Sequence, residues 1–127
     1  MGSESELIRW AVESLASVEG FSMPPASLAE DAFLLSLAFP DRDDYLMACA
    51  STCRAIERLV RGCVMASDLK YDFKGWKSFH FQHRVGQGVR ATMRIVYREV
   101  DGGIEVLGFG HRTIPLDLYK RLRRDRT

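Results

Sequence analysis

The histidines of this chain stand among arginines in its C-terminal half, and these two residue types can act together on a phosphodiester. The residues concerned are His80, His83, His111, Arg84, Arg90, Arg94 and Arg112. Metal-independent RNA cleavage requires a base for the 2′-hydroxyl proton, an acid for the leaving 5′-oxygen and cations for the phosphorane charge. Histidine, with an ordinary pKa of about 6.5, can be acid or base, and the planar arginine side chain matches a phosphate. Acid–base chemistry on RNA is therefore a first hypothesis.

Alternation of residue types after Gly75 predicts three strands that would position these side chains. We expect the strands at 76–84, 90–100 and 104–110, with turns at 85–89 and 101–103. Side chains two residues apart share a face of a strand. One sheet face would then carry His80, Gln82 and Arg84 together with Arg90, Thr92, Arg94, Val96 and Arg98. The other face would pack on helices, and His80 and Arg94 become the first candidates for catalysis.

The other histidines have alternative roles. His83 falls on the apolar face and is expected as a core or edge histidine, unless a bulge near Gly86 turns it outward. His111 can orient Arg112, end the strand, or take part in the chemistry directly. A zinc site made of His80, His83 and a cysteine lacks the usual spacing and ligand number, so we expect no metal and no other cofactor.

Helices are expected before the sheet and after it. Residues 5–18 have a helical apolar stripe that Gly20 ends, and residues 21–27 form a connection. Residues 32–39 fit either a buried strand or the end of a helix, which Ser27 would open as N-cap with Glu30 in a capping box.

The remaining elements complete the expected architecture. A helix over 41–62 would be capped by Asp41 and ended by Gly62, residues 63–75 would form a loop, and Pro115 would open a short basic helix over 116–124. The order predicts one α+β domain over residues 1–127. N-terminal helices would pack on a small antiparallel meander that a C-terminal helix closes.

The C-terminal half resembles the RelE/ParE toxin superfamily. The resemblance rests on the strand Arg94-Ile95-Val96-Tyr97-Arg98, on the aliphatic segment 104–112 that ends in Gly-His-Arg, and on Tyr119. It implies a toxin core over 41–127 and a helical extension over 1–40. It also implies that Arg94, Arg112 and Tyr119 act at the cut site.

The resemblance implies further RNA contacts and shows departures. The expected RNA-binding residues are Lys77, His83, Arg84, Arg90, Arg98 and His111. His80 and Gln82 replace lysines that are common on that strand, and Tyr119 stands further from Arg112 than is usual. Residues 1–40 have no counterpart in minimal members, and they could add packing, bind a partner or cover the basic face.

The function that follows is a toxin of a toxin–antitoxin system, an endoribonuclease that cuts mRNA either free or on the ribosome without a metal. Its partners would be RNA and a cognate antitoxin protein. The alternative is a non-catalytic protein of the same fold that inhibits an enzyme such as gyrase or binds nucleic acid without cutting it.

Charge and composition agree with a polyanionic partner. Residues 1–65 hold 5 Lys/Arg and 10 Asp/Glu, whereas residues 66–127 hold 13 Lys/Arg and 7 Asp/Glu. The basic half would bind a polyanion, or it would pair with the acidic half as an ordinary solvated surface. No apolar run is long enough to span a membrane, and the acidic N-terminus lacks a secretory pattern, so we expect a cytoplasmic protein. Three cysteines fit a reducing compartment, with Cys49 and Cys53 as core side chains.

Overall fold

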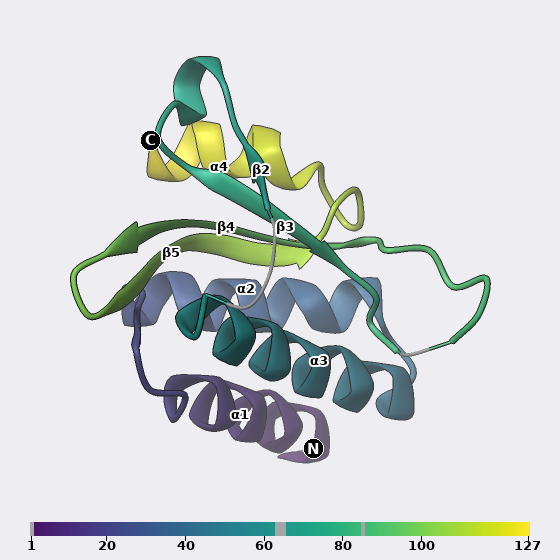
Figure 1. Ribbon diagram of the computed structural model, residues 1–127. Coiled ribbons are helices and arrows are strands. Elements are labelled where there is room, and N and C mark those ends of the chain that lie inside the picture. Colours follow the sequence, from purple (N-terminus) through teal and green to yellow (C-terminus); the bar gives the residue numbers. More distant parts are fainter. Residues whose placement is uncertain (1, 63–65, 85) are drawn as a thin grey trace.

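A five-stranded mixed sheet runs through the middle of the protein, with helices on both of its faces (Figure 1). The computed structural model describes residues 2–62, 66–84 and 86–127. The strands are β1 (Phe21–Ser22), β2 (Ser67–Asp68), β3 (Lys77–Phe81), β4 (Met93–Val100) and β5 (Gly103–His111). The helices are α1 (Gly2–Ala16), α2 (Pro25–Ala38), α3 (Arg42–Val60) and α4 (Leu118–Arg126), with a 3-10 turn η1 (Tyr71–Phe73). The expected α+β class is confirmed.

The sheet order is β1-β5-β4-β3-β2, so short strands that were not predicted, β1 and β2, extend the expected three-stranded meander at both edges. Strands β3, β4 and β5 are antiparallel neighbours, as predicted, and β2, which lies in the segment expected as a loop, pairs with β3 in antiparallel orientation. Strand β1 pairs with β5 in parallel, with Phe21 opposite Ile104. The expected antiparallel sheet therefore gains one parallel strand. The sequence did not predict β1, because a strand of two residues is too short to show an alternating pattern.

The β4–β5 hairpin forms where its turn residues predict it. Val100 pairs with Gly103 across Asp101 and Gly102, and Gly102 has a φ of 83°, in the left-handed region that glycine adopts readily. A register shift further along leaves Leu107 without a partner, since Val96 faces Gly108 while Tyr97 faces Val106. Beyond this bulge, each residue of β5 points to the opposite face of the sheet from the one that strict alternation would give it.

Because of the bulge, Val106 and Phe109 both lie in the core between the sheet and helices α1 to α3, although they are three residues apart. Gly108 and Gly110 accordingly face the other way.

Helices α2 and α3 lie against one face of the sheet, and α1 packs on these two helices from the far side (Figure 1). The core between them and the sheet includes Leu15 of α1, Leu35 of α2, Ile56 of α3 and Ile95 of β4, all with at most 1% of their surface exposed. Residues 1–40 thus contribute side chains to the same core as the sheet. Of the three roles left open for this segment, packing is the one that the structure shows.

Residues 32–39, left open between strand and helix, belong to helix α2 as far as Ala38, followed by Phe39 as C-cap. The predicted capping box was wrong. Pro24 is the N-cap and Pro25 starts the helix, while Ser27 lies inside it. Proline suits this place because the first helical N–H groups have no partner within the helix.

Helix α3 follows the sequence prediction closely. The Asp41 carboxylate accepts a hydrogen bond of 3.0 Å from the backbone N–H of Asp44, and Gly62, with φ 70°, follows the C-cap residue Arg61. The predicted loop over 63–75 falls partly outside the described residues. Its described part contains β2 and η1.

Helix α4 packs on the opposite face of the sheet and makes a second apolar cluster there. Leu118 and Leu122 are fully buried against Val96. Gly108 permits this approach, because a Cβ on it would stand 2.4 Å from Leu122 Cδ2. The helix begins later than predicted. Asp117, not Pro115, precedes it, and its carboxylate accepts a hydrogen bond of 3.0 Å from Lys120 N.

A buried ionic cluster protects the edge of β5 beyond β1. The Asp31 carboxylate of α2 accepts a hydrogen bond of 3.0 Å from Phe109 N and lies 2.6 Å from Arg121 and 2.8 Å from Arg126. Arg126 also donates to the Leu107 carbonyl oxygen at 3.0 Å. These side chains satisfy backbone groups that an edge strand would otherwise leave open, and they join α2 to α4.

The first two predicted strands, 76–84 and 90–100, extended too far into the loop that joins them. Strand β3 ends at Phe81 and β4 begins at Met93. In the described part of the connection, the Gln82 side chain donates to the carbonyl oxygens of Gly86 and Val89, so it holds a loop rather than a tight turn. The predicted turn residue 85 lies outside the described residues.

Candidate functional site

A row of residues crosses three strands on the side of the sheet that carries α4. His80 of β3 lies opposite Arg94 of β4, and Arg94 lies opposite Gly110 of β5. The predicted alternation thus brings the two first candidates, His80 and Arg94, to neighbouring places on one face. His80 is exposed, whereas Ser78, two residues earlier on the same face of β3, is buried beneath Tyr119 of α4.

Arg94 is almost fully buried, although its predicted place on the polar face of the sheet implied an exposed side chain. Only 6% of its surface is exposed, and its Nη1 donates to the carbonyl oxygens of Ala91 at 2.5 Å and Met93 at 2.9 Å. Its Nε is buried and has no partner among the described residues. Burial lowers the pKa of Arg94, and Tyr119 acts in the opposite direction. Arg94 therefore lies beneath the site as a fixed positive charge.

Arg112 is the exposed arginine of the cluster, and its backbone is held from both sides. Its N–H donates to Thr92 O at 2.9 Å, and its carbonyl oxygen accepts from Leu118 N at 2.8 Å. Among the described residues, Arg112 forms no ion pair with Asp117. The Asp117 carboxylate instead caps helix α4. The guanidinium group of Arg112 stands at the surface.

Tyr119 joins the same cluster from helix α4. Its hydroxyl lies 2.7 Å from the hydroxyl of Ser78 on β3, and its ring meets Phe73 edge-on at 6.2 Å between centroids. Ser78 is 1% exposed and was not among the predicted site residues. The alternation that selected His80 places Ser78 on the same face, two residues earlier, so the signal for it was present.

The electrostatics of His80 reflect its neighbours. Burial, then Arg94, then Arg112 lower the pKa of His80 below its ordinary value. The two cations favour the neutral imidazole, which is the form that accepts a proton. The four residues predicted for catalysis, His80, Arg94, Arg112 and Tyr119, thus form one cluster on the structure.

The rings of the two other histidines both lie against Phe39, the C-cap residue of α2. The His83 ring stands 4.5 Å from the Phe39 ring, and His111 meets Phe39 at 5.9 Å. The Nδ1 of His111 accepts hydrogen bonds of 3.1 Å from the N–H groups of Thr113 and Ile114. This bonding ends β5 and starts the next turn, the strand-ending role considered for His111. Burial is the main cause that lowers the pKa of both histidines.

The remaining predicted RNA-binding residues divide into two groups. Arg84 and Arg90 are exposed in the loop between β3 and β4. Lys77 and Arg98 lie toward the end of the sheet that carries the β4–β5 turn. There, Lys77 pairs with Glu99 at 3.2 Å and Arg98 with Glu105 at 3.0 Å. The Arg98 guanidinium also lies 4.6 Å from the centre of the Trp76 ring. The structure does not bring this second group to the cluster.

The described cysteines and acidic residues do not form a metal centre. Cys49 is 1% exposed in the core, where burial raises its pKa to about 12, and Cys53 packs against the same core. Among the described residues, no three His, Cys, Asp or Glu side chains are grouped to hold a metal ion. Each helix in the described ranges is too short or too polar to cross a membrane.

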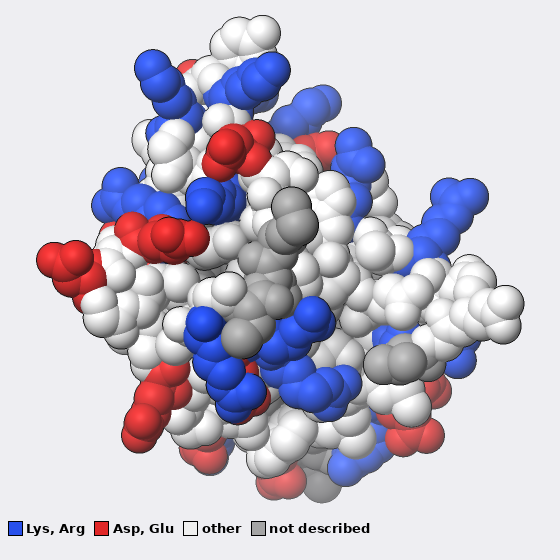
Figure 2. Space-filling view, in the orientation of Figure 1, with Lys and Arg blue, Asp and Glu red and all other residues white. Residues whose placement is uncertain are grey.

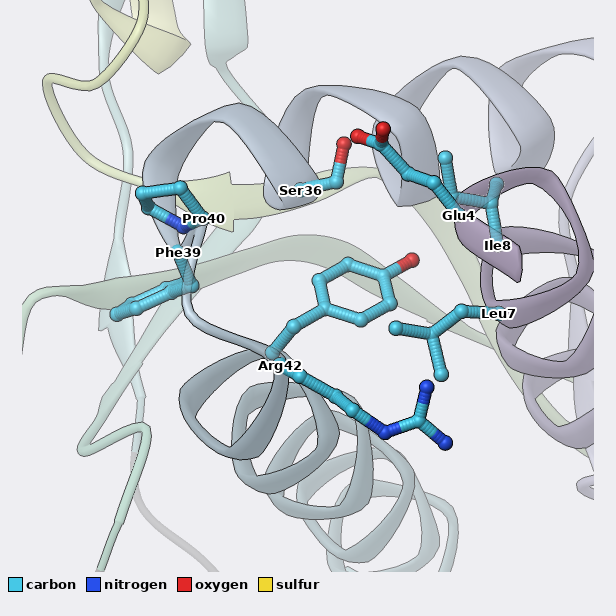
Figure 3. A pocket seen from close by; sticks show the side chains of 8 residues that line it. Glu4, Leu7, Ile8, Ser36, Phe39, Pro40 and Arg42 are labelled. Atoms are coloured by element: carbon cyan, nitrogen blue, oxygen red, sulfur yellow. The ribbon is translucent and has the colours of Figure 1, made fainter. Parts of the chain in front are cut away.

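A separate cavity of about 320 Å³ opens within the helical layer (Figure 3). Leu7 and Ile8 of α1 face side chains from α2, α3 and the connection between them, and Glu4 and Arg42 are the charged residues of the lining. The cavity contains no histidine and belongs to the opposite face of the sheet from His80. It therefore adds no group to the cluster.

Comparison of the chain with models of protein families, with curated proteins and with solved structures gave no significant match. The residues of the site themselves are therefore the basis on which a function can be proposed.

Proposed function

We propose that the protein is an endoribonuclease that cuts single-stranded RNA by metal-independent transesterification, as the toxin of a toxin–antitoxin pair. The observation that carries the proposal is the position of exposed His80, paired in register with Arg94 on one sheet face and near Arg112. Burial first, and then these two cations, lower the pKa of His80. A histidine kept neutral among cations suits a base that acts on a substrate whose negative charge grows in the transition state. The resemblance of segment 94–119 to RelE/ParE toxins supports the same reaction.

In the proposed reaction, neutral His80 removes the proton from a ribose 2′-hydroxyl. The 2′-oxygen attacks the adjacent phosphorus, and the bond from phosphorus to the 5′-oxygen breaks. Arg112 carries its charge toward the phosphate oxygens, while buried Arg94 adds a fixed positive potential from below. The Tyr119 hydroxyl, held by Ser78, donates a proton to the leaving 5′-oxygen. The products are a 2′,3′-cyclic phosphate and a 5′-hydroxyl.

The test is incubation of the purified protein with single-stranded RNA, and separately with translating ribosomes, in the presence of a chelator. The expected result is cleavage that leaves 2′,3′-cyclic phosphate ends and is lost in His80→Ala. Absence of cleavage in both settings, or a complete requirement for a divalent metal, would overturn the proposal.

A second candidate function is non-catalytic inhibition or nucleic-acid binding by the same surface. The burial of Arg94, whose Nη1 is occupied by two carbonyl oxygens, favours it, because fewer cationic donors then reach a substrate. A double variant, His80→Ala/Arg112→Ala, separates the two functions in a growth assay. Toxicity that survives this change would assign the protein to the non-catalytic class.

The proposed antitoxin would present an acidic or amphipathic segment to the basic surface. Co-expression of the chain with the small genes next to its own should yield a complex, and the complex should lack RNA cleavage. A chain that purifies alone, active and harmless to its host, would argue against such a partner.

A further inference from the structure

A groove between α3 and the outer part of β3 borders the candidate site. Its volume is about 520 Å³, and its lining includes Arg54 and Arg58 from α3 and Phe79, His80 and Phe81 from β3. His80 belongs both to this groove and to the cationic cluster. Because Phe79 and Phe81 lie on the opposite face of β3 from the His80 side chain, the groove and the cluster adjoin at the edge of this strand.

The opening exists because the outer strand of the sheet is short. Among the described residues, β2 pairs with Lys77 and Ser78 and with no other residue of β3, which leaves the remainder of β3 as an edge within this part of the chain. Gln82 and Ala91, from the loop that follows β3, complete the lining of the groove. The Ala91 carbonyl oxygen in turn holds Arg94, which connects this wall to the cluster.

The charge of the groove has one sign. Arg54 and Arg58 are exposed, neither forms an ion pair with another described residue, and the lining contains no carboxylate. Figure 2 shows Lys and Arg side chains gathered over α3 beneath the strand β3. These arginines come from the half of the chain that is acidic in total. Only the folded structure brings them beside the basic half.

The geometry of the two arginines suits a nucleic-acid strand. Arg54 donates to the Ser51 hydroxyl at 3.1 Å, and the Arg58 guanidinium lies 5.8 Å from the centre of the Phe79 ring. These contacts restrain both side chains without neutralising them. Phe81 is partly buried and lines the same groove. Arginines that follow a backbone beside an aromatic side chain are typical of surfaces that bind single strands.

We infer that this groove binds the single-stranded RNA that flanks the cut phosphate on one side, with Arg54 and Arg58 contacting its phosphates. The inference rests on the proposed function, since it takes RNA as the substrate of the neighbouring cluster. It adds a binding segment that gives longer strands higher affinity than short ones.

The test compares two variants of equal charge. Arg54→Gln/Arg58→Gln removes the groove cations and keeps part of each aliphatic stem, which preserves the packing on Phe79. Arg9→Gln/Arg42→Gln removes two exposed arginines from the helical layer as the control. Both variants should keep the wild-type circular dichroism spectrum and melting temperature. Affinity is measured by fluorescence anisotropy with 2′-O-methyl RNA, which cannot be cleaved because it lacks the nucleophile.

We expect the groove variant to bind an oligomer of about twelve nucleotides roughly tenfold more weakly, with a salt slope reduced by about 1.4 for two lost phosphate contacts on a single strand. Binding of an oligomer of about three nucleotides should not change, and the control variant should match the wild type for both. Equal affinity of the groove and control variants for the longer RNA would overturn the inference, and so would equal weakening for both lengths. Loss of binding to an acidic peptide, with RNA binding intact, would assign the groove to a protein partner instead. No binding of either RNA by the wild type would overturn the proposed function and the groove with it.

Discussion

The hydroxyl groups of Ser78 and Tyr119 lie 2.7 Å apart, although the residues stand 41 positions apart in the chain. Ser78 belongs to the outer half of the sheet and Tyr119 to the helix that covers it. Since Ser78 is almost fully buried, this contact determines the direction in which the Tyr119 hydroxyl points. Ser78 is thus a positioning residue for the proposed acid.

The first prediction concerns this pair. Ser78→Ala should lower kcat about fivefold with little change in KM, which corresponds to the loss of about 1 kcal/mol from one hydrogen bond. Tyr119→Phe should lower kcat further because it removes the proton donor itself. The double variant should equal Tyr119→Phe alone, because Ser78 acts through the hydroxyl that is already absent. Effects that simply add would mean that Ser78 has an independent role.

A second prediction concerns Arg112, whose side chain is exposed and whose structural contacts are made by its backbone. Arg112→Ala should reduce kcat/KM by about 10²–10³ while the melting temperature stays close to that of the wild type. Arg112→Lys should restore only part of the rate, because an ammonium group lacks the two-pronged geometry of guanidinium. Cleavage within a few fold of wild type for Arg112→Ala would remove Arg112 from the site.

The pH dependence of cleavage gives a third prediction. Burial and the charges of Arg94 and Arg112 lower the pKa of His80, so the neutral base persists below pH of about 6.5. The cleavage rate should rise with pH through this lowered pKa and level off before neutrality. In Arg112→Ala one of the cations is absent, so the pKa of His80 should rise and the acidic limb should move to higher pH.

The residual activity of Arg112→Ala, measured from acid to neutral pH, tests this shift. A matched substitution, Arg98→Ala, removes an arginine that is paired with Glu105 nearer the other end of the sheet, and it should leave the acidic limb in place. An unchanged limb in both variants would show that His80 does not control the rate.

The fourth prediction concerns the buried Asp31 cluster. Asp31 is fully buried with Arg121 and Arg126, so Asp31→Ala leaves two cations without their main partner. The free energy of unfolding should fall by about 3–5 kcal/mol, as measured in urea. The exposed pair of Arg124 and Asp125 provides the control, and Asp125→Ala should leave the unfolding midpoint almost unchanged. A small loss in Asp31→Ala would mean that α4 is held mainly by Leu118 and Leu122.

Local signals were sufficient for several elements of this protein. Asp41 and Gly62 delimit helix α3, and the pair Asp101-Gly102 places the β4–β5 hairpin, because capping and left-handed turn geometry depend on neighbouring residues alone. Alternation then placed His80 and Arg94 on the same face, with Ser78 available by the same rule. The α+β class and the shared sheet face of His80 and Arg94 follow from these local patterns, whereas Arg112 and Tyr119 were expected at the site from the resemblance.

Other features depended on contacts between distant segments, and no local pattern could specify them. The helical state of residues 32–38 accompanies a salt bridge between Asp31 and Arg121, 90 positions later. The bulge at Leu107 decides which glycines face α4, and α4 decides that Arg94 is buried while Arg112 is exposed. The sequence by itself determined which residues can do chemistry and which strands carry them. Only the tertiary structure decided which of them reach solvent, because exposure depends on what packs above each strand.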